Sequence, residues 1–313
     1  MIEVKNVTKK YGSTIAVDDI SFTINDGEIV GLLGPNGAGK STTMNMLTGF
    51  IEQTTGEIII DGFDMLRKSN KAKREIGYMP EGTPLYTDLT VKEFVTYMAE
   101  IKRVDRKVRK EEVSNIIKQT GLEEVQNKLI KNLSRGYKQR TSMAGALVGK
   151  PKILILDEPT VGLDPKQITE IRSLIKELGK THTIILSSHI LSEVSQICNK
   201  VIIINKGKIV AVDTPEKLED RFSNKHGLNL IIEDREKKAK EVLDGIKDIS
   251  SYKKVKENED GTVEYLVETK TDVDLRKKIF SDFAKSEITI LEMKKIDTSL
   301  EDVFIELIKG GNE

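Results

Sequence analysis

The spacing of apolar residues separates the first 215 residues of the chain from the rest. Alternating or fully apolar runs predict short strands at 1–7, 16–24, 27–33 and 55–62. Uninterrupted β-branched runs predict buried strands at 153–156, 183–186 and 201–204. Because strands that alternate with helices are typical of a parallel sheet, we expect residues 1–215 to form an α/β core.

A helical insertion interrupts this core. Thr90 and Glu93 have the spacing of a capping box, and apolar residues follow them at helical intervals. Helical spacing continues, with charged interruptions, to about Gly149, which predicts a helical subdomain over about 90–147. A shorter helix is predicted at 40–49.

Beyond Pro215 the pattern predicts a second, smaller domain over 216–313. Strands are predicted at 228–233, 251–257, 263–267 and 287–293, with helical stripes at 239–246 and 275–283. The resulting β-α-β-β-α-β order is that of ferredoxin-like α+β domains. A last helix is predicted from Thr298, with Glu301 completing its capping box.

Composition adds few constraints. Lys+Arg and Asp+Glu number 50 each, so net charge gives no reason to expect a nucleic-acid partner. Cys198 is the only cysteine, which excludes an internal disulfide, and we expect it to be a buried, inert thiol. The amino terminus lacks the apolar run of a signal peptide, and no stretch approaches the roughly 18 apolar residues of a membrane span, so a cytoplasmic chain is expected.

Two motifs carry chemistry. The sequence GPNGAGKST (34–42) fits the phosphate-binding pattern G-x-x-x-x-G-K-[ST] between a predicted strand and a predicted helix. Its backbone amides and the helix dipole favour phosphates, Lys40 would reach the β- and γ-phosphates, and the Ser41 hydroxyl would ligate Mg²⁺. The predicted nucleotide ligands here are Asn36, Gly37, Ala38, Gly39, Lys40, Ser41 and Thr42.

The second motif is ILILDEPT (153–160), an apolar strand that ends in two acids. Ligands of α/β proteins bind at the carboxyl ends of the strands. Asp157 therefore fits a Mg²⁺ ligand, and Glu158 fits the general base that orients and deprotonates the attacking water.

The ordered series of the phosphate loop, LSRGY (133–137), LDEPT, GLDP (162–165) and SSHI with His189 resembles the ATP-binding subunits of ABC transporters. The resemblance covers residues 1–215, and MPEGTPLY, LSRGYKQR and TSLEDVFIELI are similar to the ABC-2 exporter branch. It implies a P-loop NTPase core with a helical subdomain, and ATP and Mg²⁺ as cofactors. It also implies that Tyr11 stacks on adenine, that His189 binds the γ-phosphate and that Asp164 couples two ATP sites.

The resemblance also explains a glycine in the first turn of a helix, where it costs about 1 kcal/mol relative to alanine. In this family each ATP lies between two ATPase domains, and LSRGY of one subunit closes on the γ-phosphate held by the other. Ser134 would present its hydroxyl and the positive helix end to the partner's nucleotide. Gly136 would let the backbone N–H approach a phosphate without a side chain in the way.

Two departures from the family pattern stand out. The common signature is LSGGQ, and here Arg135 and Tyr137 replace a glycine and the glutamine. Arg135 could contact the nucleotide or face solvent. Glu81 stands where the family has the glutamine of the Q-loop, and its carboxylate could also ligate Mg²⁺.

The predicted function is therefore an ATP-hydrolysing subunit, peripheral on the cytoplasmic face of the membrane, that powers a separate membrane-spanning permease, with export as the direction. It would pair with a second ATPase subunit, as a homodimer or a heterodimer. The alternative is a soluble ABC ATPase acting on ribosomes or DNA. The single set of motifs and the neutral net charge both argue against this alternative. For the domain at 216–313, dimer stabilisation or partner contact is favoured over regulation by a small ligand.

Overall fold

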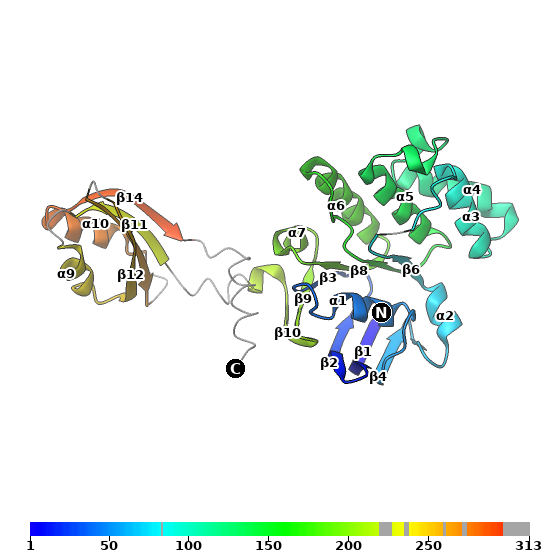
Figure 1. The fold of residues 1–313 in the computed structure, drawn as a ribbon, viewed down its shortest axis with the longest axis horizontal. Coiled ribbons are helices and arrows are strands. Elements are labelled where there is room, and N and C mark those ends of the chain that lie inside the picture. Colours follow the sequence, from blue (N-terminus) through cyan, green and yellow to red (C-terminus); the bar gives the residue numbers. More distant parts are fainter. Residues whose placement is uncertain (83, 219–226, 235–237, 259–260, 271–273, 297–313) are drawn as a thin grey trace. The chain divides into compact units, whose positions relative to one another are not determined.

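The computed structural model describes residues 1–82, 84–218, 227–234, 238–258, 261–270 and 274–296. The chain divides into two compact units, whose described parts lie within residues 1–215 and 216–296 (Figure 1). Within the described part of the chain, no helix combines the length and the apolarity needed to cross a bilayer.

An antiparallel sheet opens the first unit. Its strands are β1 (Ile2–Tyr11), β2 (Thr14–Ile24), β4 (Thr55–Ile60) and β5 (Phe63–Asp64), in the order β2-β1-β4-β5. Buried and exposed residues alternate clearly in the second half of β2, where Ile20, Phe22 and Ile24 are buried, and Val17 earlier in the strand is buried as well. The predicted strands at 1–7, 16–24 and 55–62 are thus present, and they form a sheet of their own.

The second sheet of this unit has six strands. They are β3 (Ile29–Leu33), β6 (Ile76–Met79), β7 (Ile153–Leu156), β8 (Thr183–Ser188), β9 (Lys200–Asn205) and β10 (Lys208–Asp213), in the order β10-β9-β3-β8-β7-β6. All neighbours are parallel except β10, which pairs antiparallel with β9. The predicted parallel sheet is therefore confirmed for its fully apolar strands. The sequence pattern missed the two edge strands, β6 and β10.

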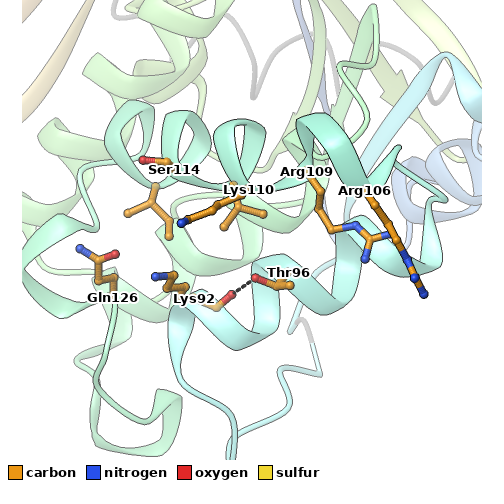
Figure 2. Close-up of a pocket in the computed structure, with 9 residues that line it drawn as sticks. Lys92, Thr96, Arg106, Arg109, Lys110, Ser114 and Gln126 are labelled. Carbon is orange, nitrogen blue, oxygen red and sulfur yellow. Dashed lines mark hydrogen bonds between the residues drawn. The ribbon is translucent and has the colours of Figure 1, made fainter.

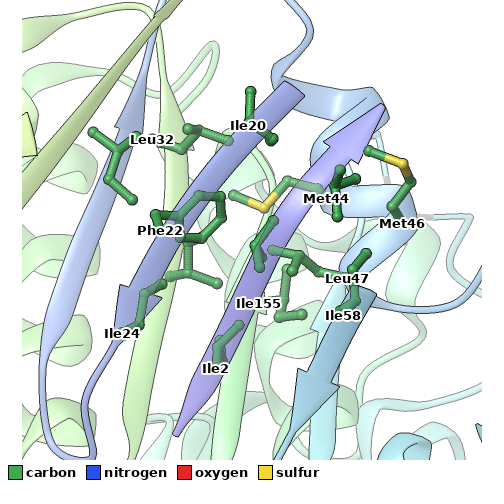
Figure 3. Packing of buried hydrophobic residues seen from close by; sticks show 14 of the residues in the cluster. Ile2, Ile20, Phe22, Ile24, Leu32, Met44, Met46, Leu47, Ile58 and Ile155 are labelled. Atoms are coloured by element: carbon green, nitrogen blue, oxygen red, sulfur yellow. The ribbon is translucent and has the colours of Figure 1, made fainter. Parts of the chain in front are cut away.

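Helix α1 (Lys40–Leu47) lies between the two sheets and contacts both (Figure 1). Its Met44, Met46 and Leu47 pack among side chains from β1, β2, β3, β4 and β7 (Figure 3). Helices α6 (Pro165–Gly179) and α7 (Leu191–Ser195) cover the other face of the six-stranded sheet. A short helix, α2 (Ser69–Arg74), precedes β6. Because the first residue of α1 is buried, the phosphate-binding loop that precedes it rests on a rigid base.

The helical subdomain contains α3 (Val91–Ile101), α4 (Arg106–Gln119) and α5 (Arg135–Leu147), with 3₁₀ turns at Glu123–Val125 and Ile130–Asn132. The predicted capping box is confirmed, because the Thr90 hydroxyl accepts from the Glu93 amide and the Glu93 carboxylate accepts from the Thr90 amide. Helix α5 contacts β6 and so joins the helical subdomain to the α/β core.

The second unit follows the predicted order β11 (Gly227–Glu233), α9 (Ala239–Asp244), β12 (Ile249–Glu257), β13 (Thr262–Thr269), α10 (Arg276–Lys285) and β14 (Thr289–Ile296). Its antiparallel sheet has the order β12-β13-β11-β14, which is a split β-α-β arrangement. Leu230, Tyr265, Ile279 and Phe283 are part of a core of its own. The helix predicted from Thr298 lies outside the described residues.

Candidate functional site

A cavity of about 450 Å³ lies at the carboxyl ends of four neighbouring parallel strands, β3, β8, β7 and β6. Nine of the predicted site residues line it: Asn36, Gly37, Gly39, Lys40, Ser41, Thr42, Glu81, Glu158 and His189. Ala16 and Val161 complete the lining. Residues from four distant stretches of sequence therefore converge because the strands that carry them are adjacent.

The loop that follows β3 wraps around one end of this cavity. Its last residue, Gly39, is the N-cap of α1 with φ of 108°, a conformation that favours glycine. A Cβ there would also lie only 2.7 Å from the carbonyl oxygen of Ala16. The backbone is thus held close to β2, and its amides and the first turn of α1 form an anion-binding loop.

Lys40 begins α1 with its side chain almost fully buried. Its ammonium donates to the carbonyl oxygens of Gly34 (2.8 Å) and Pro35 (3.3 Å) and lies 3.7 Å from Glu158 Oε1. The charge is therefore fixed between the loop and the carboxylate that ends β7.

Asp157 and Glu158 follow β7 and are both buried. Ser187, at the end of the neighbouring strand β8, connects them, because its hydroxyl donates to Asp157 Oδ1 (2.5 Å) and accepts from the Glu158 amide (2.8 Å). Glu158 has φ of 48°, which is uncommon for a residue with a side chain and typical of functional sites. Sequence reasoning missed Ser187, because only strand pairing reveals its contacts.

Burial is the main cause that raises the pKa of Asp157, and the nearby Glu81 carboxylate adds to it. The Ser187 hydrogen bond and the Lys40 charge act in the opposite direction. Asp157 does not line the cavity wall, yet it interacts with Glu81 and Lys40, which do. Its carboxylate thus belongs to the same electrostatic site.

His189 follows β8, and its Nδ1 lies 3.0 Å from Glu158 Oε2. An ionised carboxylate only accepts hydrogen bonds, so Nδ1 carries the proton in this contact. The predicted base and the predicted γ-phosphate ligand are therefore hydrogen-bonded to each other.

Tyr11, Ala38 and the LSRGY residues are not among those lining the cavity. Tyr11 ends β1 half exposed, with the Lys9 ammonium 5.0 Å from its ring centroid. Ala38 is buried beneath the loop and accepts from the Gly207 amide (2.9 Å).

Ser134 is the N-cap of α5, as predicted, and its hydroxyl accepts from the Tyr137 amide (3.4 Å). Gly136 is buried, and a Cβ there would lie 3.0–3.1 Å from the side chain of Gln167. Asp164 caps α6 by accepting from the Gln167 amide (2.9 Å). The signature and GLDP segments are thus neighbours within one chain.

Arg135 extends this contact. Its guanidinium lies against Gly162 so closely that a Cβ at that glycine would meet its Cζ at 2.2 Å. Arg135, one of the two residues that depart from the family signature, therefore packs on the GLDP segment of its own chain.

Within the described residues, no group of three or more His, Cys, Asp or Glu side chains has the arrangement of a metal site. Asp157, Glu81 and Ser41 nevertheless supply two carboxylates and a hydroxyl around one cavity. Such hard oxygen ligands fit Mg²⁺, which takes only one or two carboxylates from a protein when phosphates supply further ligands.

The fold and the site together define a P-loop nucleotide-binding protein, because a G-x-x-x-x-G-K-S loop joins a parallel strand to a buried helix at the cavity. The chain belongs to the family of ABC transporter ATP-binding subunits, and the ABC transporter family model matches residues 17–161.

Three similar proteins support this assignment. The bacitracin transport ATP-binding protein BcrA of Bacillus licheniformis is 36% identical over 313 residues, covering 99% of this chain and 98% of that protein. The linearmycin resistance ATP-binding protein LnrL of Bacillus subtilis (strain 168) is 36% identical, covering 71% of this chain and 72% of that protein. A solved dimer of the ATP-binding cassette MJ0796, in a post-hydrolysis state bound to ADP and Pi, has a TM-score of 0.62 and 28% identity, covering 68% of this chain and 98% of that chain.

Family membership confirms the predicted class of function. The chain is an ATP-binding and ATP-hydrolysing subunit that pairs with a second ATPase subunit and powers a separate membrane permease.

Proposed function

We propose that this subunit uses the cavity at the ends of β3, β6, β7 and β8 to hydrolyse ATP and thereby drive export through its permease. The observation that supports this most directly is the contact set around Glu158, which lies 3.7 Å from the Lys40 ammonium and 3.0 Å from His189. A buried carboxylate held between two nitrogen groups has a fixed orientation. Such a carboxylate can serve as the general base that activates water, which ATP hydrolysis in this family requires.

In this proposal the loop amides and Lys40 bind the β- and γ-phosphates of ATP, and Glu158 accepts the proton of the attacking water. His189 orients the Glu158 carboxylate through Nδ1, which leaves Nε2 for the γ-phosphate. Ser187 positions the base by accepting from the Glu158 amide. Each group is held before the substrate arrives, so little reorganisation is needed in the transition state.

Ser41, Asp157 and Glu81 would hold Mg²⁺. The ion would supply positive charge to the phosphate oxygens. The raised pKa of Asp157 agrees with this role, because a cation beside a crowded pair of carboxylates relieves the repulsion that contributes to that shift.

Ser134 and Gly136 would complete the partner subunit's ATP site, and Tyr11 would stack on adenine. Ser134 and Tyr11 are exposed, which supports these two roles, whereas Gly136 is buried beside Gln167. The domain at 216–313 would stabilise the dimer or contact the permease. The complex would lie on the cytoplasmic face of the membrane.

The names of two relatives refer to bacitracin transport and linearmycin resistance, and they support a proposal for the cargo. We propose that this subunit drives the export of a compound of the class of bacitracin or linearmycin. Deleting its gene would then sensitise the native cells to compounds of that class, and unchanged sensitivity to all of them would contradict the proposal.

Glu158→Gln tests the catalytic part. The variant keeps the size of the side chain but cannot act as a base, so we expect ATP to bind normally while turnover falls by about 10²–10⁴-fold. Glu177→Gln, at an exposed position of α6, is the matched control and should keep wild-type turnover. A Glu158→Gln rate within about threefold of wild type would refute the assignment, since a general base contributes far more.

The same variant tests the partner. Glu158→Gln, purified from detergent-solubilised native cells with Mg·ATP, is expected to retain a multi-span membrane protein in near-stoichiometric yield. Recovery of ribosomal or DNA-bound proteins without a membrane protein would instead support the soluble mechanical class.

A further inference from the structure

A cavity of about 280 Å³ between α3 and α4 is lined in part by basic side chains, but these do not converge (Figure 2). Arg106 points away from Lys92 and Lys110, and all three side chains are exposed. Exposed cations that diverge offer an anion no joint site. Two buried polar side chains that do not line the ATP cavity, Thr160 and Glu193, instead contact each other beside the segment that carries Glu158.

Thr160 and Glu193 form a buried hydrogen bond between segments that are distant in sequence. Thr160 lies two residues after Glu158, and Glu193 lies four residues after His189, in α7. The two residues are 5% and 6% exposed, and the Thr160 hydroxyl donates to Glu193 Oε2 at 2.5 Å. Burying a carboxylate is costly, so a contact that offsets this cost is expected to hold its partner firmly.

This hydrogen bond is a third link between the segments at the ends of β7 and β8. Ser187 accepts from the Glu158 amide, and His189 Nδ1 lies 3.0 Å from Glu158 Oε2. The Thr160–Glu193 contact continues this series in the same direction along both segments. It closes a ring, because Glu158 and Thr160 on one segment are bonded to His189 and Glu193 on the other.

Helix α7 gives Glu193 a fixed support. Its Leu191 and Val194 are 1% and 0% exposed. Val194 packs against β3 so closely that a Cβ at Gly31 would meet its Cγ1 at 2.1 Å. The Glu193 carboxylate is therefore anchored to the six-stranded sheet, and through the hydrogen bond so is Thr160.

The segment after β7 needs support, because its backbone is in an unfavourable conformation. Glu158 has φ of 48°, and such a conformation persists in a residue with a side chain only where the surroundings enforce it. The Gln139 side-chain amide, from α5, donates to the Pro159 carbonyl oxygen (2.8 Å). Pro159 and Thr160 are thus held by side chains from two different helices. Together these contacts fix the backbone that directs the Glu158 carboxylate.

We propose that Glu193 is a positioning residue for ATP hydrolysis, which acts through Thr160 to keep the Glu158 carboxylate directed at His189 and the attacking water. This inference rests on the proposed role of Glu158 as the general base. Glu193 and Thr160 do not line the ATP cavity, so their loss should leave nucleotide binding nearly unchanged. Turnover should fall, because a displacement of about 1 Å at the reacting groups can slow an enzyme by about 100-fold.

Substitutions on both sides of the contact, made in the full-length chain, test this role by kcat, KM and the Kd for ATP. Glu193→Ala and Thr160→Val each remove one partner, and we expect kcat to fall by about 10–100-fold while the Kd stays within about threefold of wild type. Glu193→Gln keeps an oxygen that can accept from Thr160, so its kcat should stay within about threefold of wild type. A Glu193→Gln variant as slow as Glu193→Ala would overturn the proposal.

Combining the two substitutions shows whether they act as a pair. Glu193→Ala with Thr160→Val should lose no more turnover than the slower single variant, because both changes break the same contact. Losses that multiply would mean that the two residues act independently, which also overturns the proposal.

The Glu158→Gln background separates positioning from general damage to the fold. There, Glu193→Ala should slow the residual phosphate release by less than about threefold, because no base is left to position. A loss of about 10–100-fold in this background too would overturn the proposal. Glu112→Ala is the matched control, since it removes another buried carboxylate, which accepts from the Gly149 amide (2.7 Å) in the helical subdomain. Its melting temperature should fall while kcat stays within about threefold of wild type; a loss of kcat equal to that of Glu193→Ala would point to destabilisation alone.

These variants distinguish failure of this inference from failure of the proposed function. If Glu158→Gln is inactive and Glu193→Ala keeps wild-type kcat, only the positioning role is wrong. If Glu158→Gln itself keeps wild-type kcat, the base assignment is wrong and the positioning role falls with it. Should Glu193→Ala fail to fold, Thr160→Val measures the same contact, and wild-type kcat in that variant overturns the proposal.

Discussion

Gly136 offers a direct test of the role of the signature helix, through the substitution Gly136→Ala. The residue is the second of α5, immediately after Arg135, and is buried. Alanine would improve the helix by up to about 1 kcal/mol. The new Cβ would lie 3.0–3.1 Å from the Gln167 side chain, which must shift by a few tenths of an ångström. Such a shift costs of order 0.5–1.5 kcal/mol if it strains a rotamer.

These two effects nearly cancel, so stability should change by about 1 kcal/mol or less in either direction. For a unit of this size that corresponds to a change in Tm of roughly 2–4 °C at most. Catalysis should respond differently, because in the proposed role the Gly136 backbone N–H binds the partner's phosphate, and the Gln167 side chain that the methyl group displaces lies beside it. Loss of one hydrogen bond to a charged group costs about 1.5–3 kcal/mol. That is roughly a 10–150-fold loss in kcat/KM.

The assay measures phosphate release at several ATP concentrations, alongside the melting temperature. Gly145→Ala is the matched control, because it makes the same substitution in the same helix, against the Phe94 ring rather than near Ser134. We expect this control to change stability but to keep its ATPase rate within about threefold, since it touches no group that stabilises the transition state. A folded Gly136→Ala variant with wild-type kcat/KM would show that close phosphate approach is not the reason for this glycine.

Three further substitutions separate stability from catalysis. Ser187→Ala leaves the buried Glu158 amide and the Asp157 carboxylate without their shared partner, so we expect a loss of about 1–3 kcal/mol by chemical denaturation and a slower ATPase. The pKa of Asp157 is raised in the folded state, so its ionisation costs folding stability once the pH rises above the pKa that the group has in the unfolded chain. Asp157→Asn should therefore raise the melting temperature at neutral pH and abolish Mg-dependent turnover. A lower melting temperature would contradict this account. Thr90→Ala removes the cap of α3 and should cost about 0.5–2 kcal/mol, measured by denaturant titration, with ATP affinity unchanged.

Local sequence patterns were sufficient wherever the chemistry lies in one continuous segment. The loop at 34–42 was predicted with its strand and its helix, because glycines, a lysine and a hydroxyl at fixed spacing permit few other structures. The acids after the apolar run at 153–156 were placed correctly at a strand end for the same reason. The capping box of α3 is equally local.

Elements with weak local signals were missed. Strand β6 has four residues, including a glycine, and β10 forms the edge of the sheet. Strand β6 lacks a long apolar run, and the apolar run at 209–212 in β10 is only partly buried, so hydrogen bonding to a neighbouring strand decides the conformation of each. This matters for function, because β6 carries Glu81 to the cavity.

The sequence by itself therefore determined the identity of the chemical groups: a phosphate-binding loop, two acids at a strand end and a serine-capped helix with a glycine in its first turn. Only the tertiary structure decided which groups meet. The order β3-β8-β7-β6 places Ser187 between Asp157 and Glu158. Such contacts depend on strand order and helix packing, which minimise the free energy of the whole core and leave no mark in any single segment.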